Sequence, residues 1–286
     1  MSNIKEHFIS RYGMDGLIVE IDYSQLEIIV LAHLSQDPQL IKDIVSGIDL
    51  HTVRAADMYR IPEHKVTKEQ RKTAKSFSFQ LQYGSGAKKM AEQVGATEKE
   101  AQAFIFAYYS RYPKVKEMQD RWIEEVKSNR YPTTEKSAKG YPIGKSHYTS
   151  PTGREYVFVE TDSPEWMQKR GTHTSFKPTT IKNYKVQGLA TGDIVPMMVG
   201  VLVRWIYENN LDEDVKFVNT VHDSIVLDIR KDKLYTVAHG AKELLESAPA
   251  FLKSNFNIDF TLPLKVEVSY GHDWHNQVKY SFDEEA

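Results

Sequence analysis

Two aspartates follow apolar segments that lie far apart in the chain. Asp22 ends an apolar run from Leu17, and Asp223 lies between two further runs, 215–221 and 224–229. A single Asp in such a place is commonly a cap or turn residue. Two of them from distant segments can meet at one sheet edge, where carboxylates supply the oxygen ligands that Mg²⁺ prefers. Two metal ions held in this way would favour phosphoryl or nucleotidyl transfer.

A second candidate site lies on a helix that we expect to begin after Thr67. Thr67 and Gln70 have the spacing of a capping box, and the helix is predicted to continue to about Tyr83. Four side chains recur along it at four-residue steps: Arg71, Lys75, Phe79 and Tyr83. Cations near the start suit phosphates, and aromatic residues further along suit stacking on a base. Core packing remains the alternative for the two aromatic residues taken alone.

Basic residues are concentrated in two parts of a nearly neutral chain. The whole chain has 37 Lys and Arg against 39 Asp and Glu, a net charge of −2. Residues 65–89 contain seven basic residues and one acidic residue, and residues 135–185 contain nine and five. A basic helix followed by a basic loop suits a polyphosphate or a nucleic-acid backbone. A solvated helix face is the simpler alternative.

The composition is that of a folded protein with one large domain or two small ones. The chain has 286 residues, of which 41% are hydrophobic. The absence of cysteine excludes disulfides, cysteine-ligated zinc and thiol nucleophiles. The N-terminus has no signal-peptide core, and the longest apolar stretch, 194–203, is shorter than the roughly 18 residues of a spanning helix. We therefore expect a soluble, cytoplasmic protein without a membrane partner.

The apolar patterns predict a mixed α/β chain with a helical middle. Strands are predicted at 17–22, 215–221, 224–229 and 264–268, and helices at 25–34, 67–83, 97–109, 113–128, 188–209 and 231–254. The helix from 97 begins with a second capping box, Thr97 with Glu100. Residues 131–180 are rich in Pro and Gly, which predicts loop and a short hairpin with one strand at 154–160.

Three ordered segments resemble the signatures of family A DNA polymerases, the DNA polymerase I type. They are 22–27 (DYSQLE), 71–84, and 221–223 (VHD). Further matches are LAHLS at 31–35, HT at 51–52, VQG at 186–188, and the segment from 266–268 to the DW pair at 273–274. The resemblance covers nearly the whole chain except about 131–180.

The resemblance implies an α/β (α+β) fold in which helical fingers are inserted into an antiparallel-sheet palm. The palm would comprise 1–38 and 181–286. The fingers would span 39–180, with a Pro/Gly-rich insert at 131–180.

The resemblance also implies template-directed DNA synthesis, in which dNTPs are added to a primer 3′-hydroxyl on primer–template DNA. Asp22 and Asp223 would hold two Mg²⁺ ions, helped by the backbone carbonyl of Tyr23. Arg71 and Lys75 would bind the triphosphate, and Lys75 would donate a proton to the pyrophosphate leaving group.

The remaining implied roles concern the nucleotide and the primer end. Gln25 and His51 would add contacts to the nucleotide. Glu27, held by Tyr83, would close the space for a ribose 2′-hydroxyl, and Phe79 would pack by the sugar. Gln187 and His222 would touch the minor groove near the primer end.

The sequence departs from the family pattern at three positions. Ser224 stands where the family usually has Glu, Ile29 where many relatives have Arg, and Gln80 where Gly is common. His-Asp-Ser also resembles single-subunit RNA polymerases, which Glu27 and Phe79 disfavour because an RNA polymerase must admit the 2′-hydroxyl. A non-catalytic DNA-binding subunit is a third interpretation. The retention of both carboxylates beside Arg71 and Lys75 disfavours it.

The chain begins about twenty residues before Asp22. In the family, a thumb and an exonuclease-like domain precede this point. We therefore expect the palm and fingers portion of a phage-like split polymerase or of a truncated one. A separate polypeptide would carry the thumb and exonuclease domains. The protein would act in DNA replication, in the host cytoplasm if phage-encoded.

Overall fold

The chain folds as two compact units. The structure is a computed structural model that describes residues 4–82 and 85–282. One unit, here the sheet unit, contains residues 1–29 and 189–286, and the other, the helical unit, contains residues 30–188. The boundaries therefore fall at 29/30 and 188/189, compared with the predicted 38/39 and 180/181. The mixed α/β class with antiparallel sheets is confirmed.

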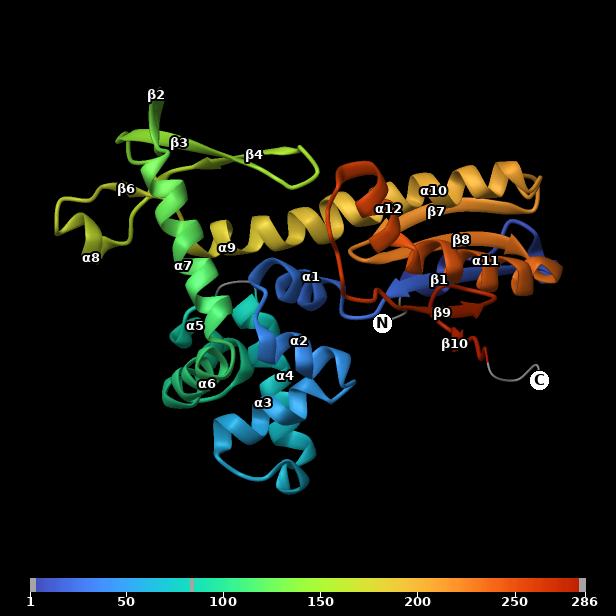
Figure 1. Ribbon diagram of the computed structural model, residues 1–286, viewed down its shortest axis with the longest axis horizontal. Coiled ribbons are helices and arrows are strands. Elements are labelled where there is room, and N and C mark those ends of the chain that lie inside the picture. Colours follow the sequence, from blue (N-terminus) through green and yellow to red (C-terminus); the bar gives the residue numbers. More distant parts are fainter. Residues whose placement is uncertain (1–3, 83–84, 283–286) are drawn as a thin grey trace. The chain divides into compact units, whose positions relative to one another are not determined.

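The sheet unit is built on five antiparallel strands in the order β10-β9-β1-β8-β7 (Figure 1). The strands are β1 (Gly16–Tyr23), β7 (Val215–Val221), β8 (Ser224–Arg230), β9 (Val266–Gly271) and β10 (Val278–Lys279). Side chains alternate between the two faces of each strand. Val19, Ile21 and Leu227 are fully buried on one face. The opposite face carries Glu20 and Asp22, so the alternation separates the core from the polar residues.

Three helices complete the sheet unit: α10 (Val195–Glu208), α11 (Leu234–Glu246) and α12 (Ala248–Phe256). Helix α11 packs on β1 and β9 and contacts α10. The single helix predicted at 231–254 is wrong. A 3₁₀ turn (Lys231–Lys233) precedes α11, and Ser247 separates α11 from α12. Pro249 lies in the first turn of α12, where its missing N–H costs no helical hydrogen bond.

The helical unit contains α2 (Pro38–Val45), α3 (Leu50–Tyr59), α4 (Lys68–Gln82), α5 (Ala87–Val94), α6 (Glu98–Arg111), α7 (Pro113–Ser128) and α9 (Pro178–Gln187). Helix α1 (Leu26–Ser35) crosses the boundary at 29/30. A short 3₁₀ turn occupies Glu63–Lys65, and two more, Ile4–His7 and Gly13–Asp15, belong to the sheet unit. Both predicted capping boxes are present. Thr67 N–H donates to Gln70 Oε1 at 2.9 Å while Gln70 N–H donates to Thr67 Oγ1 at 3.2 Å, and Thr97 and Glu100 repeat the pattern.

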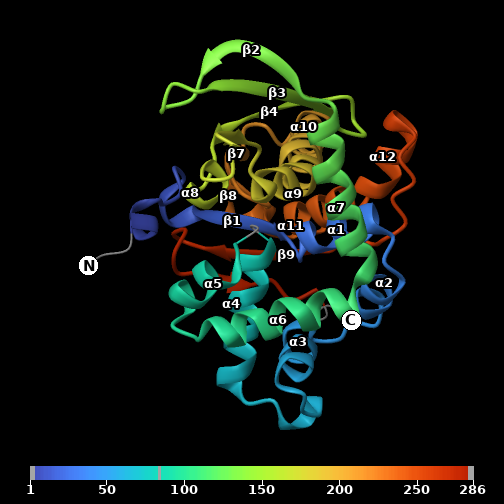
Figure 2. The same cartoon turned by 90° about the vertical axis from the view of Figure 1, so that its left-hand side faces the viewer.

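The Pro/Gly-rich segment belongs to the helical unit. The strand predicted at 154–160 is confirmed, but the segment contains more strands than the predicted loop and short hairpin. It forms a three-stranded antiparallel sheet of β2 (Tyr131–Lys136), β3 (Pro142–Thr149) and β4 (Glu155–Val159), which lies against α7 and α9 (Figure 2). Two short strands, β5 (Thr161–Asp162) and β6 (Thr174–Ser175), pair around α8 (Glu165–Gln168). The buried carboxylate of Glu160 accepts both arms of Arg130, at 2.8 and 2.9 Å. This pair anchors the end of β4 to the start of β2.

Helices α9 and α10 are joined by a π-helical turn (Gly188–Ile194) into one helix over 178–208. By length and composition alone, this helix could cross a membrane. Half of its most apolar 18-residue window is buried inside the protein, and one such helix is weak evidence for a membrane span.

Candidate active site

The structure brings Asp22 and Asp223 together at the end of β1. Asp223 lies in the tight turn between β7 and β8, and the register of β8 on β1 places Ser224 directly opposite Asp22. Tyr23 N–H donates to the Asp223 backbone carbonyl at 3.2 Å, which holds the turn against the strand. The two carboxyl groups lie close enough for the negative charge of Asp223 to raise the pKa of Asp22. Segments that are far apart in the sequence therefore converge, as the sequence predicts.

The electrostatics of this pair favour a bound cation. Partial burial raises the pKa of the Asp22 carboxyl to about 6, with further contributions from the negative charges of Asp223, Glu20 and Glu267. Burial also raises the pKa of Asp223. Carboxylates placed so closely repel one another when both are ionised. A divalent cation removes this cost, so the donor set fits Mg²⁺.

The two carboxylates alone are fewer than a complete set of metal ligands. In the part of the chain that the structure describes, no group of three or more His, Asp or Glu side chains is placed to hold a metal ion. Mg²⁺ is commonly held by one or two carboxylates, with water and substrate phosphates at its remaining positions. Asp22 and Asp223 supply the two carboxylates of such an arrangement, and the Tyr23 carbonyl stays a predicted ligand.

The backbone next to the pair is strained at two residues. His222 in the β7–β8 turn has φ 57°, and Gln25 before α1 has φ 58°. This left-handed conformation is uncommon for residues other than Gly and costs of order 1 kcal/mol or more. Both side chains are exposed, whereas Glu27 in the first turn of α1 is half-buried. Such strain is found often at active sites.

A cationic cluster lies at the start of α3 and along α4 in the helical unit. Arg71 Nε and Nη2 donate to the carboxylate of Asp49, at 2.5 and 3.3 Å. Asp49 is also the N-cap of α3 and accepts the backbone N–H of His51 at 3.1 Å. The pKa of His51 is lowered to about 4, first by burial and then by the nearby charges of Arg54, Arg71 and Lys75, against the opposing effect of Asp49. The structure thus brings together His51, Arg71 and Lys75.

Helix α4 has one buried face and one exposed face, and these cations lie on the exposed face. Ala74, Phe77 and Leu81 are buried, and Phe77 packs on Phe104 of α6 with 5.5 Å between ring centroids. Arg71 and Lys75 are exposed. The side chain of Phe79 and the whole of Tyr83 and Gly84 lie outside the described residues, so the aromatic half of the predicted stripe stays a prediction. Gln187, at the end of α9, is half-buried.

Two carboxylates beside these residues were not predicted from the sequence. Glu20 lies two positions before Asp22 on the same strand face, and Asp49 caps the helix that carries His51. Each had a local signal. Strand alternation places Glu20 beside Asp22, and an Asp before an apolar-periodic segment is a typical helix N-cap.

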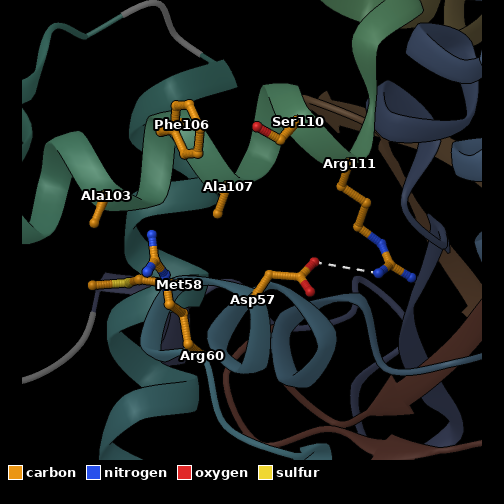
Figure 3. Close-up of a pocket in the computed structure, with 8 residues that line it drawn as sticks. All are labelled: Asp57, Met58, Arg60, Ala103, Phe106, Ala107, Ser110 and Arg111. Atoms are coloured by element: carbon orange, nitrogen blue, oxygen red, sulfur yellow. Dashed lines mark hydrogen bonds and ion pairs between the residues drawn. The ribbon is translucent and has the colours of Figure 1, made fainter.

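A cavity of about 380 Å³ in the helical unit contains none of the predicted site residues (Figure 3). Side chains from the end of α3 and from α6 line it, including Asp57, Phe106 and Arg111. Arg111 bridges to Asp57 at 3.3 Å across one end. The residues predicted to perform chemistry are therefore not grouped around this cavity.

Comparison with known proteins identifies the class to which this fold and these residues belong. The sequence model described as DNA polymerase family A matches residues 1–276. The chain therefore belongs to DNA polymerase family A.

Individual relatives match most of the chain. DNA polymerase I of Geobacillus stearothermophilus is 30% identical over 92% of the chain, and the thermostable DNA polymerase I of Thermus aquaticus is 32% identical over 95%. The DNA polymerase of Bacillus phage SP01 is 32% identical over 85%. These matches cover 26%, 28% and 24% of the respective relatives, so the chain spans about a quarter of their length.

A solved structure has a similar fold. The POL domain of Pol1 from M. smegmatis, in complex with DNA primer-template and dNTP, matches 95% of this chain and 42% of its own, with a TM-score of 0.67. At 23% identity this similarity concerns the fold, and it agrees with the mixed α/β class.

Proposed function

We propose that this chain carries out template-directed DNA synthesis, the addition of a dNTP to the 3′-hydroxyl of a primer on primer–template DNA. The observation that supports the proposal is the convergence of Asp22 and Asp223 at the end of β1, where the pKa values of both carboxyl groups are raised. A nucleotidyl-transfer site needs such a pair, whereas a protein that only binds DNA would gain nothing from burying like charges.

In the proposed reaction, the primer 3′-oxygen bonds to the α-phosphorus of the dNTP, and the bond from that phosphorus to the bridging oxygen of the β-phosphate breaks. Two Mg²⁺ ions, held by Asp22, Asp223 and the Tyr23 carbonyl, would activate the nucleophile and stabilise the leaving oxygen. Lys75 would donate a proton to the departing pyrophosphate.

Residues of the helical unit would bind the triphosphate. Arg71 presents a guanidinium, the group best suited to phosphate oxygens, and Asp49 fixes its direction in advance. The lowered pKa of His51 keeps it neutral at pH 7, so it would contact the nucleotide as a neutral hydrogen-bonding group. Gln25, Glu27, Phe79, Tyr83, Gln187 and His222 keep the roles stated above as predictions.

Primer extension with single-site variants tests the proposal. We expect Asp22→Asn and Asp223→Asn each to lower the rate by a factor of about 10³ or more, since each removes transition-state charge stabilisation. The matched control is Glu213→Gln, an isosteric change of a 91% exposed carboxylate in the same unit. Full activity of either Asn variant would contradict the two-metal assignment.

The requirement for a thumb-bearing partner stays a prediction with its own test. The chain would be assayed for primer extension by itself and together with a polypeptide that corresponds to the preceding part of its relatives. Stimulation by that polypeptide would support the split or truncated arrangement. Processive synthesis by the 286 residues alone would contradict it.

A further inference from the structure

Glu20 lies beside the aspartate pair and is held by two neutral donors. On β1 it is two residues before Asp22, so the two side chains share one face of the sheet. The Ser224 hydroxyl donates to Glu20 Oε1 at 2.9 Å, and the indole Nε1–H of Trp274 donates to Glu20 Oε2 at 3.1 Å. Both carboxylate oxygens therefore have a partner in the sheet unit, and the side chain has one defined position.

Both donors are fixed by their surroundings. Ser224 is buried directly opposite Asp22 and begins β8. Trp274 packs edge-on against Phe8 with 5.6 Å between ring centroids, and its backbone N–H donates to the Phe8 carbonyl at 3.1 Å. Lys5 Nζ lies 4.4 Å from the indole ring centroid. The N-terminal segment thus fixes the indole that orients Glu20.

Among the described residues, the carboxylate of Glu20 lacks the cation partner that two other carboxylates on the same face of the sheet have. Glu267, opposite Asp22 on β9, is paired with Lys279 at 2.6 Å, and Asp228 on β8 is paired with Arg11 at 3.1 Å. Glu20 forms no ion pair with a cation among residues 4–82 and 85–282. Its hydrogen bonds come from a hydroxyl and an indole, neither of which carries a charge to offset its own.

We propose that Glu20 is a positioning carboxylate of the nucleotidyl-transfer site. Its uncompensated charge adds to that of Asp22 and Asp223 and increases the affinity of the pair for divalent cations. Its hydrogen bond to Ser224 also fixes the strand residue that faces Asp22. This inference rests on the proposed function. It extends that function by adding a third acidic residue to the site. Glu20 lies on β1, and the neighbouring strand β8 has Ser224 at the position where the family usually has Glu.

Cation binding provides a test that does not depend on catalysis. Mn²⁺ affinity would be measured by EPR on the metal-free full chain for the wild type and for Glu20→Gln, which keeps the size of the side chain. The loss of one negative charge several ångströms from the ion is expected to weaken Mn²⁺ binding about tenfold. The Mg²⁺ concentration for half-maximal primer extension should rise by a similar factor, with little change in kcat at saturating Mg²⁺.

Two controls separate charge from structure. Glu267→Gln removes a carboxylate that is paired with Lys279 and that affects Asp22 less than Glu20 does, so it should change Mn²⁺ affinity less than Glu20→Gln does. Ser224→Ala keeps the charge of Glu20 but removes its hydrogen bond, and an intermediate loss of two- to threefold is expected. Equal Mn²⁺ affinities for Glu20→Gln and the wild type would overturn the proposal.

Moving the carboxylate gives a rescue experiment. In the double variant Glu20→Gln with Ser224→Glu, the negative charge is moved from β1 to the position on β8 that lies opposite Asp22. We expect it to recover most of the lost Mn²⁺ affinity, and a folded double variant as weak as Glu20→Gln would overturn the role of charge. The Mn²⁺ titration is informative even if the wild type does not extend primers. Failure of the proposed function is therefore distinguishable from failure of this inference.

Discussion

At the residue scale, Asp22 illustrates how a candidate catalytic group destabilises the fold that carries it. Its pKa is raised from 3.8 to about 6, first by partial burial and then by the charges of Asp223, Glu20 and Glu267. Between these two pH values the folded state holds more protons than the unfolded state. Stability therefore falls as the pH rises from about 4 to 6 and is not regained above that range.

The variant Asp22→Asn should accordingly be more stable than the wild type at pH 7.5 in EDTA. The gain is about 1 kcal/mol once solvent screening at this exposed residue is considered, which corresponds to a melting temperature higher by about 2–4 °C. At pH 4 the two proteins should have the same melting temperature. Adding Mg²⁺ should stabilise only the wild type, because the variant lacks one metal ligand. A variant that is no more stable than the wild type at pH 7.5 would contradict the repulsion between the carboxylates.

At the element scale, local signals were sufficient for the helix starts, because a capping box satisfies its own backbone donors within four residues. Thr67 and Thr97 each begin a helix as predicted. The same reasoning found only one of the strands in 131–180, the strand predicted at 154–160. There the strands are stabilised by partners that are distant in sequence, such as Arg130 with Glu160 and β4 with α9. Pro249 was a visible break signal, but the amphipathic pattern on both sides of it concealed the division between α11 and α12.

The cap of α4 should contribute measurably to stability. Thr67→Ala removes the acceptor for the Gln70 N–H, which typically costs about 1 kcal/mol. Urea denaturation followed by circular dichroism would measure the loss. Thr97→Ala should show a comparable loss at α6, and Thr134→Ala, an exposed position on β2, serves as the neutral control. A Thr67→Ala variant as stable as the Thr134→Ala control would contradict the cap.

Lys185 connects α9 to its neighbours through a buried ammonium group. The side chain is 2% exposed, pairs with Glu125 of α7 at 2.7 Å, and lies 4.1 Å from the ring centroid of Tyr148 on β3. Burial lowers its pKa. Because burying a charge costs free energy, most of the contribution of Lys185 to stability should come from the volume that its alkyl chain fills.

Lys185→Met and Lys185→Ala separate these contributions. Met fills a similar volume without charge, and Glu125 is half exposed to solvent, so Lys185→Met should lie within about 1 kcal/mol of the wild type. Lys185→Ala leaves a cavity and should cost about 3 kcal/mol. Urea denaturation would measure both variants. Equal destabilisation by Met and Ala would show that the ion pair stabilises this region more than packing does.

At the scale of the whole molecule, the near-zero net charge conceals a strong division between the units. The sheet unit has 11 Lys and Arg against 21 Asp and Glu, a net charge of −10, and the helical unit has 26 against 18, a net charge of +8. Charge counting along the sequence found the two basic segments, since composition needs no tertiary contacts. It could not place Asp223 beside Glu20 and Asp22, because the pairing of β8 with β1 brings that residue to them.

This division predicts where electrostatic affinity for DNA resides. If the helical unit contacts about four phosphates, DNA affinity measured by fluorescence anisotropy should fall by about two orders of magnitude between 50 and 200 mM salt. Reversing the exposed pair Lys88 and Lys89 on α5 to Glu should make the dependence on log salt shallower by about 2. The same reversal at exposed Lys231 and at Lys233 in the sheet unit should leave the slope unchanged. A slope that responds to the sheet-unit pair instead would place the electrostatic contacts on the acidic unit. The local charges of that unit, rather than its net charge, would then determine DNA binding.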